Sequence, residues 1–503
     1  MVLLNPLKQA GLAFRRDHTL GLLLERLAEV RGPNDLVEEA DGGLTVTVAE
    51  AAALVDLWAG GIAERVQPGQ VVVVATPNGY EQLLLCLAAS RAGAIPAPVN
   101  SLMRPDEIAH VEKDSGAALT LRAASELPSA AALGRAVPAQ PGDVAALFYT
   151  SGTTGKPKGV ELTHRSLVGS LTATALFPSG LRNDNAVVSL PIAHIMGFAI
   201  TLAMACAGVP VWFLPRFNPV RVLDAIESRH ASVYVGVPAM YRMLLEAGAE
   251  QRDLKSVRLW ISGADAMPAD LAATFKKMGA TAVLPLVGAV GEAAFAEGYG
   301  MVETGGGVAA KFSPPGFSKS LGSSMGMALP GYSFKVIDDD GNEVPRGTTG
   351  ELLVKGPGVL RGYRGDAEAT AATLTEDGWL RTGDLARLGP RNVVFFAGRK
   401  KDVIKHGGYS VYAVEIEQAL EQHPDVVEAA VIGLPDERKG ELPAAVVRLV
   451  EGAALDEAAV RAWAAERLSD YKVPVRIVAV DELPRTGTNK VQRKELLHLF
   501  DAS

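Results

Sequence analysis

Short apolar runs and segments with helical spacing alternate along the first half of the chain. Residues 71–76 form a β-branched run without a charge, as expected for a strand that is covered on both faces. Residues 80–93 have the apolar spacing of a helix, and residues 94–99 form a second apolar run. A strand, a helix and a strand joined by short links predict a parallel βαβ unit.

The alternation continues to about residue 290 and then gives way to two other patterns. From residue 331, alternating runs separated by turn residues predict a small, mostly β subdomain. From residue 412, the order helix, strand, strand, helix, strand predicts a compact α+β unit, so we place two domains at residues 1–400 and 401–503. Further helices are predicted over residues 19–30, 48–66, 163–173, 220–229 and 240–247, and further buried strands over residues 144–148, 186–190, 208–214, 232–237, 256–263 and 280–287.

Composition and charge narrow the class of protein. Apolar residues make up 48% of the 503 residues, which is ample for packed cores, and the net charge of -8 disfavours a nucleic-acid partner. Only Cys86 and Cys206 are present, which argues against a disulfide framework and favours a reducing, cytoplasmic setting. No signal peptide is evident, and the longest apolar segment, residues 198–214, predicts a helix, a turn and a buried strand instead of a membrane span. Peripheral membrane contact stays open.

The most informative stretch is residues 149–160, which read Y-T-S-G-T-T-G-K-P-K-G-V. Glycines let the backbone approach a ligand closely, hydroxyls donate to phosphate oxygens, and lysines offset negative charge, so the stretch predicts a polyphosphate-binding loop. The common P-loop motif does not fit, because Thr150 and Pro157 stand where it needs Gly and Ser or Thr. A solvated turn is the alternative interpretation of such a composition.

As a whole, the stretch resembles the phosphate loop of the adenylate-forming enzymes, which include acyl-CoA synthetases, luciferases and peptide-synthetase adenylation domains. The resemblance extends over nearly the whole chain, because four further motifs follow in the family's order. It implies an α/β fold, with a large N-terminal domain of two doubly wound subdomains plus a small β subdomain, and a mobile α+β C-terminal domain. It also assigns ATP phosphates to Thr150, Ser151, Gly152, Thr153, Thr154, Gly155, Lys156 and Lys158.

The second motif, G-Y-G-M-V-E-T at residues 298–304, is similar to the family's Y-G-x-T-E. The resemblance places Tyr299 and Gly300 beside the adenine, and it assigns Mg²⁺ to Glu303 together with Thr154. A carboxylate oxygen is a ligand that this hard cation prefers. Val302 departs from the pattern, because the family usually has a threonine there that donates to the α-phosphate. Thr304 is the neighbouring hydroxyl that could take its place.

The third and fourth motifs, W-L-R-T-G-D-L and G-R-K-K-D, resemble the ribose site and the hinge of the family. Asp384 would accept both ribose hydroxyls, since a carboxylate suits a vicinal diol. Arg399 would contact ribose or phosphate, and Lys401 would lie at the hinge between the domains. The loop that follows resembles the lining of the thiol tunnel, with Gly408 closest to the thiol of CoA.

The fifth motif, P-R-T-G-T-N-K at residues 484–490, identifies Lys490 as the adenylation lysine by resemblance. A cation is needed there because a carboxylate must approach the negatively charged α-phosphate. Asn489 replaces the usual glycine and can still adopt the left-handed conformation. On the acyl side, His194 follows a Pro-Ile-Ala segment and resembles the gate near the substrate carboxylate. A histidine that is only part of the core is the alternative for this position.

These motifs together predict an acid–thiol ligase that forms acyl-AMP from ATP and a carboxylic acid and then passes the acyl group to CoA. We expect a medium- or long-chain fatty acid, since residues 288–296 are small and would leave room for a chain. One alternative is a ligase that loads a carrier protein. The other is a catalytically impaired nucleotide-binding homologue, which the departures at Val302 and Asn489 favour.

Overall fold

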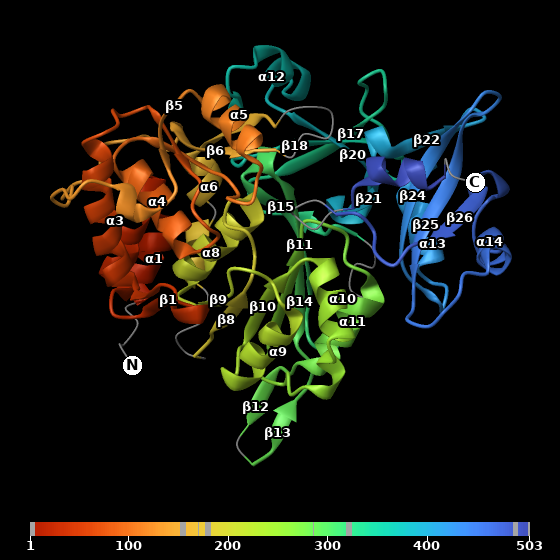
Figure 1. Ribbon diagram of the computed structural model, residues 1–503, viewed down its shortest axis with the longest axis horizontal. Coiled ribbons are helices and arrows are strands. Elements are labelled where there is room, and N and C mark those ends of the chain that lie inside the picture. Colours follow the sequence, from red (N-terminus) through yellow and green to blue (C-terminus); the bar gives the residue numbers. More distant parts are fainter. Residues whose placement is uncertain are drawn as a thin grey trace. The chain divides into compact units, whose positions relative to one another are not determined.

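The computed structural model describes residues 6–150, 157–169, 171–176, 183–284, 286–317, 324–485 and 491–500 (Figure 1). The contacts divide the chain into two compact units, each of which is described by itself. Unit 1 comprises Met1–Ser333 and Val354–Leu380, and unit 2 comprises Phe334–Leu353 and Arg381–Ser503. The predicted domain boundary between residues 400 and 401 stays a prediction.

A nine-stranded mixed sheet is the centre of unit 1. Its order is β16 (Met327–Ala328), β15 (Gly306–Ser313), β14 (Ala294–Met301), β11 (Leu259–Gly263), β10 (Val233–Gly236), β8 (Ala186–Val188), β9 (Val211–Phe213), β1 (Asp35–Glu39), β2 (Thr45–Thr47). The six strands from β14 to β1 are parallel, and the edges are antiparallel. The buried strands expected near residues 186, 208, 232 and 256 are therefore confirmed.

Helices cover both faces of this sheet. On one face, Tyr234 and Trp260 pack with the side chains of α9 (Pro219–Ser228), α10 (Pro238–Glu246) and α11 (Ala269–Met278). On the other face, Val188 and Val235 belong to a core that includes α8 (Ile195–Ala207). Alternate residues of each strand point to opposite faces, so strands covered in this way must be apolar throughout.

A second, three-stranded parallel sheet contains the predicted βαβ unit. It runs in the order β4 (Ile95–Pro98), β3 (Val71–Val74), β5 (Ala117–Leu121), and α4 (Tyr80–Arg91) connects β3 to β4. Eleven residues of α4 are buried, which explains why apolar residues occur on all sides of this helix. The other helices of this part of the chain are α1 (Pro6–Phe14), α2 (Leu23–Arg31), α3 (Val48–Ala63) and α5 (Pro105–Ser115).

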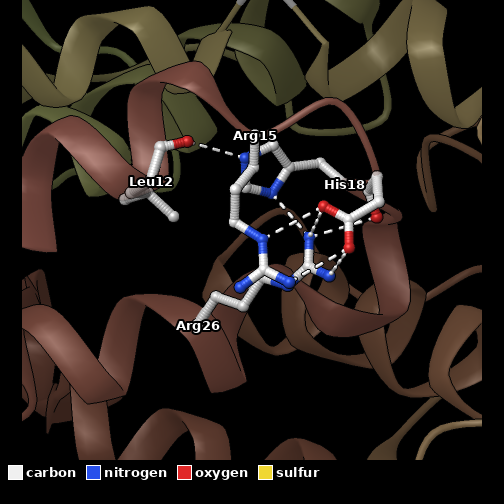
Figure 2. Close-up of polar contacts among 5 residues, drawn as sticks. Leu12, Arg15, His18 and Arg26 are labelled. Carbon is white, nitrogen blue, oxygen red and sulfur yellow. Dashed lines mark hydrogen bonds and ion pairs between the residues drawn. The ribbon is translucent and has the colours of Figure 1, made fainter.

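A hydrogen-bonded cluster joins the ends of α1 and α2 (Figure 2). His18 lies between them: its Nε2 donates to the Leu12 carbonyl at 2.7 Å, so its Nδ1 accepts from Arg26 at 2.9 Å. Arg26 also pairs with Asp17 at 2.8 Å, and Arg15 pairs with the same carboxylate at 3.1 Å. Burial lowers the pKa of His18, as does the guanidinium of Arg26, so the ring stays neutral in this arrangement.

One local prediction for unit 1 is wrong, and another holds only in part. Residues 280–287 do not enter the large sheet; instead β12 (Ala282–Leu284) pairs with β13 (Gly288–Val290) as an exposed hairpin. The helix expected over residues 163–173 is shorter than predicted: β7 (Gly159–Thr163) ends where α6 (His164–Val168) begins, and a 3₁₀ helix follows at Leu171–Leu176. By contrast, residues 198–214 do form the predicted helix, turn and strand. No helix within the described part of the chain is long and apolar enough to cross a membrane.

Unit 2 consists mainly of two sheets. The first has the order β17 (Ser333–Ile337), β18 (Gly350–Lys355), β20 (Leu380–Leu388), β21 (Val394–Arg399), as the alternating pattern after residue 331 predicted. The second has the order β23 (Tyr409–Tyr412), β22 (Val403–His406), β25 (Gly440–Leu449), β24 (Val426–Asp436), and β26 (Arg476–Ala479) pairs with β25. With α13 (Ala413–Leu420) and α14 (Glu457–Ala465), this second sheet confirms the predicted order of the α+β unit.

Candidate active site

The predicted phosphate loop connects the two strands of a hairpin in unit 1. β6 (Val144–Tyr149) pairs with β7, and the last pair is Tyr149 with Gly159. Beyond that pair, the Thr150 amide donates to the Lys158 carbonyl at 3.1 Å, and the Lys158 amide donates to Thr150 Oγ1 at 3.5 Å. These bonds close the base of the loop, while the loop residues Ser151 to Lys156 lie outside the described residues.

Lys158 is held at the base of this loop by residues about 200 positions later in the chain. Its ammonium lies 3.1 Å from Asp366 Oδ2 and 5.5 Å from the centre of the Tyr363 ring. Tyr363 belongs to the two-residue strand β19 (Gly362–Tyr363), which pairs with β7, so the contact follows from the sheet. Neither Tyr363 nor Asp366 belongs to one of the five motifs, so both partners of Lys158 become visible only in the fold.

The same tyrosine contacts the predicted metal ligand. Glu303 lies in the 3₁₀ helix Val302–Thr304, and its Oε1 accepts a hydrogen bond from Tyr363 Oη at 3.1 Å. The Glu303 carbonyl also accepts from the Leu360 amide at 2.8 Å. Burial raises the pKa of Tyr363, and the Glu303 charge adds to this effect, so the phenol stays protonated as a donor. The fold thus brings Lys158 over the ring of Tyr363 and Glu303 to the hydroxyl of the same tyrosine.

Thr304 does not replace the hydroxyl that is missing at Val302. Its side chain is only 1% exposed, and its Oγ1 donates toward the Gly306 and Met301 carbonyls at 2.7 and 3.0 Å. The same oxygen accepts from the Met301 amide at 3.0 Å. All of these partners are backbone groups of its own turn, so the suggestion that Thr304 contacts the α-phosphate is wrong. Val302 itself packs against the apolar core.

The adenine motif lies on β14, where the sheet is irregular. The register between β14 and β15 shifts between Tyr299 and Gly300. A Cβ atom added at Gly300 would lie 1.9 Å from the Gly306 carbonyl oxygen, so only glycine fits at this position. Tyr299 is half-buried directly before this point. The motif therefore places a half-buried aromatic ring beside backbone that comes unusually close to the next strand.

His194 caps the helix that faces the parallel sheet. Its Nδ1 accepts from the Met196 amide at 3.3 Å, as expected of an N-cap residue of α8. The segment before it is anchored by Asn78, whose Oδ1 accepts from the Ile192 amide at 2.8 Å and whose Nδ2 donates to the Pro215 carbonyl at 2.8 Å. His194 is half-buried, which is compatible with either a gate or a cap. Asn78 carried no motif that sequence reasoning could have recognised.

Small residues of the sheet meet apolar side chains of α8 next to His194. A Cβ atom added at Gly263 would lie 3.4 Å from the Met196 methyl group and 3.1 Å from the Gly298 carbonyl oxygen. One added at Gly306 would lie 3.6 Å from Ala199. This is the apolar region next to the adenine motif. We expected residues 288–296 to leave room for the acyl chain of the substrate. This prediction is wrong for residues 288–290, because Gly288–Val290 is an exposed strand.

In unit 2, Asp384 and Arg399 are paired on neighbouring strands. They are register partners in β20 and β21, and Arg399 Nε lies 2.7 Å from Asp384 Oδ1. Thr382 fixes the turn before the aspartate, since its hydroxyl donates to the Leu352 carbonyl at 2.7 Å and accepts from the Asp384 amide at 3.0 Å. Gly383 has φ +68°, a conformation that favours glycine. The structure therefore pairs two residues that the resemblance assigned separately, Asp384 to the ribose hydroxyls and Arg399 to ribose or phosphate.

The hinge and thiol motifs follow directly along the chain. Lys401 lies in a 3₁₀ helix, Lys400–Asp402, and desolvation lowers the pKa of its ammonium, as do Arg399 and Arg493. Gly407 and Gly408 form the turn between β22 and β23, with φ values of +56° and +86°. In the part of the chain that the structure describes, nothing lies within 4 Å of a Cβ added at Gly408, so this backbone leaves room for a ligand.

Lys490 lies outside the described residues, but its flanks are well defined. Arg485 and Val491 form an antiparallel bridge, and the Gln492 amide donates to the Pro484 carbonyl at 2.8 Å. Arg485 in turn pairs with the buried Glu428 at 2.5 Å. The two flanks of the segment that carries the predicted catalytic lysine are therefore paired with each other, and the buried Glu428 holds the first of them through Arg485.

Comparisons with known proteins agree with the order of the motifs. The sequence model of the AMP-binding enzyme family matches residues 25–364, and that of the AMP-binding enzyme C-terminal domain matches residues 415–490. The feruloyl-CoA synthase of Amycolatopsis sp is 33% identical over 91% of this chain and 95% of its own. The indoleacetate–CoA ligase of Aromatoleum aromaticum is 34% identical over 90% of this chain and 93% of its own.

Solved structures give the same result for the fold. The ATP-bound MatB of Rhodopseudomonas palustris superposes with a TM-score of 0.83 and 32% identity, covering 96% of this chain and 99% of its own. The o-succinylbenzoate CoA synthetase MenE of Bacillus subtilis, in complex with ATP and magnesium ion, has a TM-score of 0.80 and 28% identity, covering 94% of this chain and 98% of its own. The expected α/β architecture is therefore confirmed.

Proposed function

Since this chain belongs to the AMP-binding enzyme family, we propose that it is an AMP-forming CoA ligase for an apolar carboxylic acid. The contact between Glu303 and Tyr363 carries the proposal, because it joins the adenine motif to the phosphate-loop hairpin within one unit. The relatives named as CoA ligases, and the related structures that contain ATP and magnesium, support ATP, Mg²⁺ and CoA as the ligands.

In the first step, the formation of acyl-AMP, each site residue has its own role. A substrate carboxylate oxygen attacks the α-phosphorus of ATP, an O–P bond forms, and pyrophosphate leaves. Lys158 and the loop that it closes hold the phosphates, and Lys490 stabilises the charge that builds up between the two anions. Glu303 is the carboxylate whose oxygen suits Mg²⁺, and this ion, when bound, offsets triphosphate charge. Tyr363 orients Glu303, as an outer hydrogen-bond partner orients a ligand.

The second step uses the thiol motif. The thiolate of CoA attacks the acyl carbon of acyl-AMP, the C–S bond forms, and AMP leaves with the electron pair of the broken C–O bond. Gly407 and Gly408 have no side chains, so the thiol end of CoA can approach the backbone of this turn closely. Asp384 would bind the ribose hydroxyls, with Arg399 as its partner.

The acid is most consistent with an aryl or arylalkyl monocarboxylate. Met196, Ala199 and the glycines beside them carry no charge, so they offer no partner to a second carboxylate. The feruloyl and indoleacetate relatives are named for acids of this kind. A medium- or long-chain fatty acid is the second candidate, which the smallness of Ala199 and Gly306 favours. The names of the relatives give no support to a carrier protein as the acceptor.

The test is carboxylate-dependent release of pyrophosphate from MgATP, measured with and without CoA. The panel contains acetate, octanoate, palmitate, phenylacetate, 4-coumarate, ferulate and malonate. We expect release with the aryl acids and formation of their CoA thioesters. Release that peaks with palmitate would identify the second candidate, and release without any thioester would point to another acceptor. No release with any acid would favour a catalytically impaired homologue, in which Val302 is the first residue to restore to threonine.

A further inference from the structure

The hairpin formed by β12 and β13 has no role in the proposed reaction, yet it is the most apolar exposed element described. Figure 1 shows it projecting beyond helices α9 and α11. The two strands pair from Ala282 with Val290 to Leu284 with Gly288. Its exposed large side chains, with their exposed fractions, are Val283 (57%), Leu284 (46%), Leu286 (109%), Val287 (70%) and Val290 (42%).

The backbone at the tip of the hairpin is strained at a leucine. Leu286 has φ +68°, a left-handed conformation that favours glycine or asparagine and is costly for a bulky side chain. Among the residues that the structure describes, no contact accounts for this choice, because the side chain is fully exposed. A leucine that packs against nothing in its own protein, in a position that a polar residue would suit better, indicates an apolar environment outside the protein.

The chemistry of the hairpin fits hydrocarbon better than a protein surface. Apolar side chains point to both faces of the ribbon and also occupy its tip, and residues 279–291 contain no charged residue. Protein interfaces rely on aromatic residues and arginine, and these are also absent from the hairpin sequence. A hairpin of residues 281–291 is also much smaller than the roughly 20–30 residues a side that a stable protein interface uses.

The base of the hairpin has the residues that suit the headgroup region of a bilayer. Lys277 is exposed at the end of α11, and Lys255 Nζ donates to the Lys277 carbonyl at 2.7 Å. Phe317 is 64% exposed, and its carbonyl is bound by Lys276 at 3.0 Å. Lys276 also neutralises Glu292 at 2.9 Å. The surface therefore combines an aliphatic tip with an aromatic side chain and exposed cations at its base.

We propose that this hairpin inserts into the interfacial region of an anionic lipid bilayer and docks the enzyme on the membrane surface. Insertion stops near the boundary between headgroups and acyl chains, because backbone N–H and C=O groups of a two-stranded ribbon cannot be left unpaired in hydrocarbon. Asp253, which lies two residues before Lys255, offsets part of the basic charge. The apolar side chains therefore supply most of the affinity, and salt weakens it only in part.

The experiment is sedimentation of the full chain with sucrose-loaded vesicles, either phosphatidylcholine alone or phosphatidylcholine mixed with phosphatidylglycerol. The variant Leu286→Asn with Val287→Ser is expected to bind at least tenfold more weakly to both vesicles. Asparagine suits the left-handed backbone, so the thermal unfolding midpoint should be unchanged or higher. The variant Lys277→Gln is expected to bind about fivefold more weakly to the anionic vesicles only. The matched control is Leu102→Asn, which removes another highly exposed leucine (87%) elsewhere on unit 1.

Each outcome decides the proposal. Binding that the hairpin variant loses and Leu102→Asn retains supports it. Failure of the wild-type chain to sediment with either vesicle overturns it, as does equal loss of binding in the control. Dimers in light scattering that only the hairpin variant abolishes, without vesicle binding, would show that a second copy covers the hairpin. Pyrophosphate release without vesicles is a separate readout, and the hairpin variant should leave it unchanged, so this inference can fail while the proposed function stands.

Discussion

His164 is expected to make the stability of unit 1 fall steeply with acid. The side chain is 3% exposed at the start of α6, and its Nδ1 accepts a hydrogen bond from the Leu20 amide at 3.0 Å. Burial lowers the pKa of His164 to about 4, against the opposing charge of Asp143. The unfolded chain, with an ordinary pKa of about 6.5, therefore takes up a proton first as the pH falls. Stability is fully present above pH 6.5 and is lost as the pH falls toward 4.

The two pKa values set the size of the effect. The linkage relation gives a loss of about 2 kcal/mol at pH 5 and about 3 kcal/mol at pH 4, relative to pH 8. Other groups also respond to acid. One is Asp17, because Arg15 holds the pKa of this carboxyl well below its usual range. The difference between the wild type and a matched variant isolates the histidine. His164→Asn is that variant, because its Oδ1 can accept from the Leu20 amide and does not titrate.

The assay is urea unfolding at pH 8, 6.5, 5.5 and 5, followed by tryptophan fluorescence. Four of the five tryptophans, Trp58, Trp212, Trp260 and Trp379, lie in unit 1 and report on it. The free energy of unfolding of the wild type should fall by about 2 kcal/mol more than that of the variant between pH 8 and 5. Equal pH dependence of the two proteins would show that His164 is not held neutral by burial.

Three further predictions concern the candidate site. Tyr363→Phe keeps the ring near Lys158 but removes the donor to Glu303, so the Mg²⁺ concentration for half-maximal pyrophosphate release should rise about tenfold. Gly300→Ala should destabilise unit 1 by about 3 kcal/mol in urea unfolding, because its Cβ would lie 1.9 Å from the Gly306 carbonyl oxygen. Val302→Thr should raise kcat/KM for ATP about tenfold, because a hydrogen bond to a charged oxygen contributes about 1.5–3 kcal/mol.

A different result would contradict each of these three predictions. An unchanged Mg²⁺ dependence in Tyr363→Phe would remove the tyrosine from the positioning of Glu303. For Gly300→Ala, Gly298→Ala is the control, since no described residue lies within 4 Å of a Cβ added at Gly298. Equal stability of the two variants would mean that the strands can separate at the shifted register. A Val302→Thr enzyme no faster than the wild type would show that another donor already serves the α-phosphate.

The motifs on single stretches were readable without the fold. Short-range spacing predicted the βαβ unit around β3 and α4, because backbone geometry allows few ways to bury such runs. The five motifs placed Glu303, Asp384 and Arg399 within the family's pattern. The hydrogen-bond partners of these residues could not be read from the sequence. Tyr363 lies 60 residues from Glu303, and nothing local to either residue indicates that they touch.

The sequence by itself determined most of the order of strands and helices, the family and the residue types at the site, because these depend on local periodicity and on motifs a few residues long. Tertiary structure decided what each surface faces. The apolar run at residues 280–287 reads equally well as a buried strand or an exposed hairpin, since periodicity does not say what covers a side chain. The hydroxyl of Thr304 could equally have faced a ligand or its own turn. Which of these holds depends on neighbours that only the folded chain brings together.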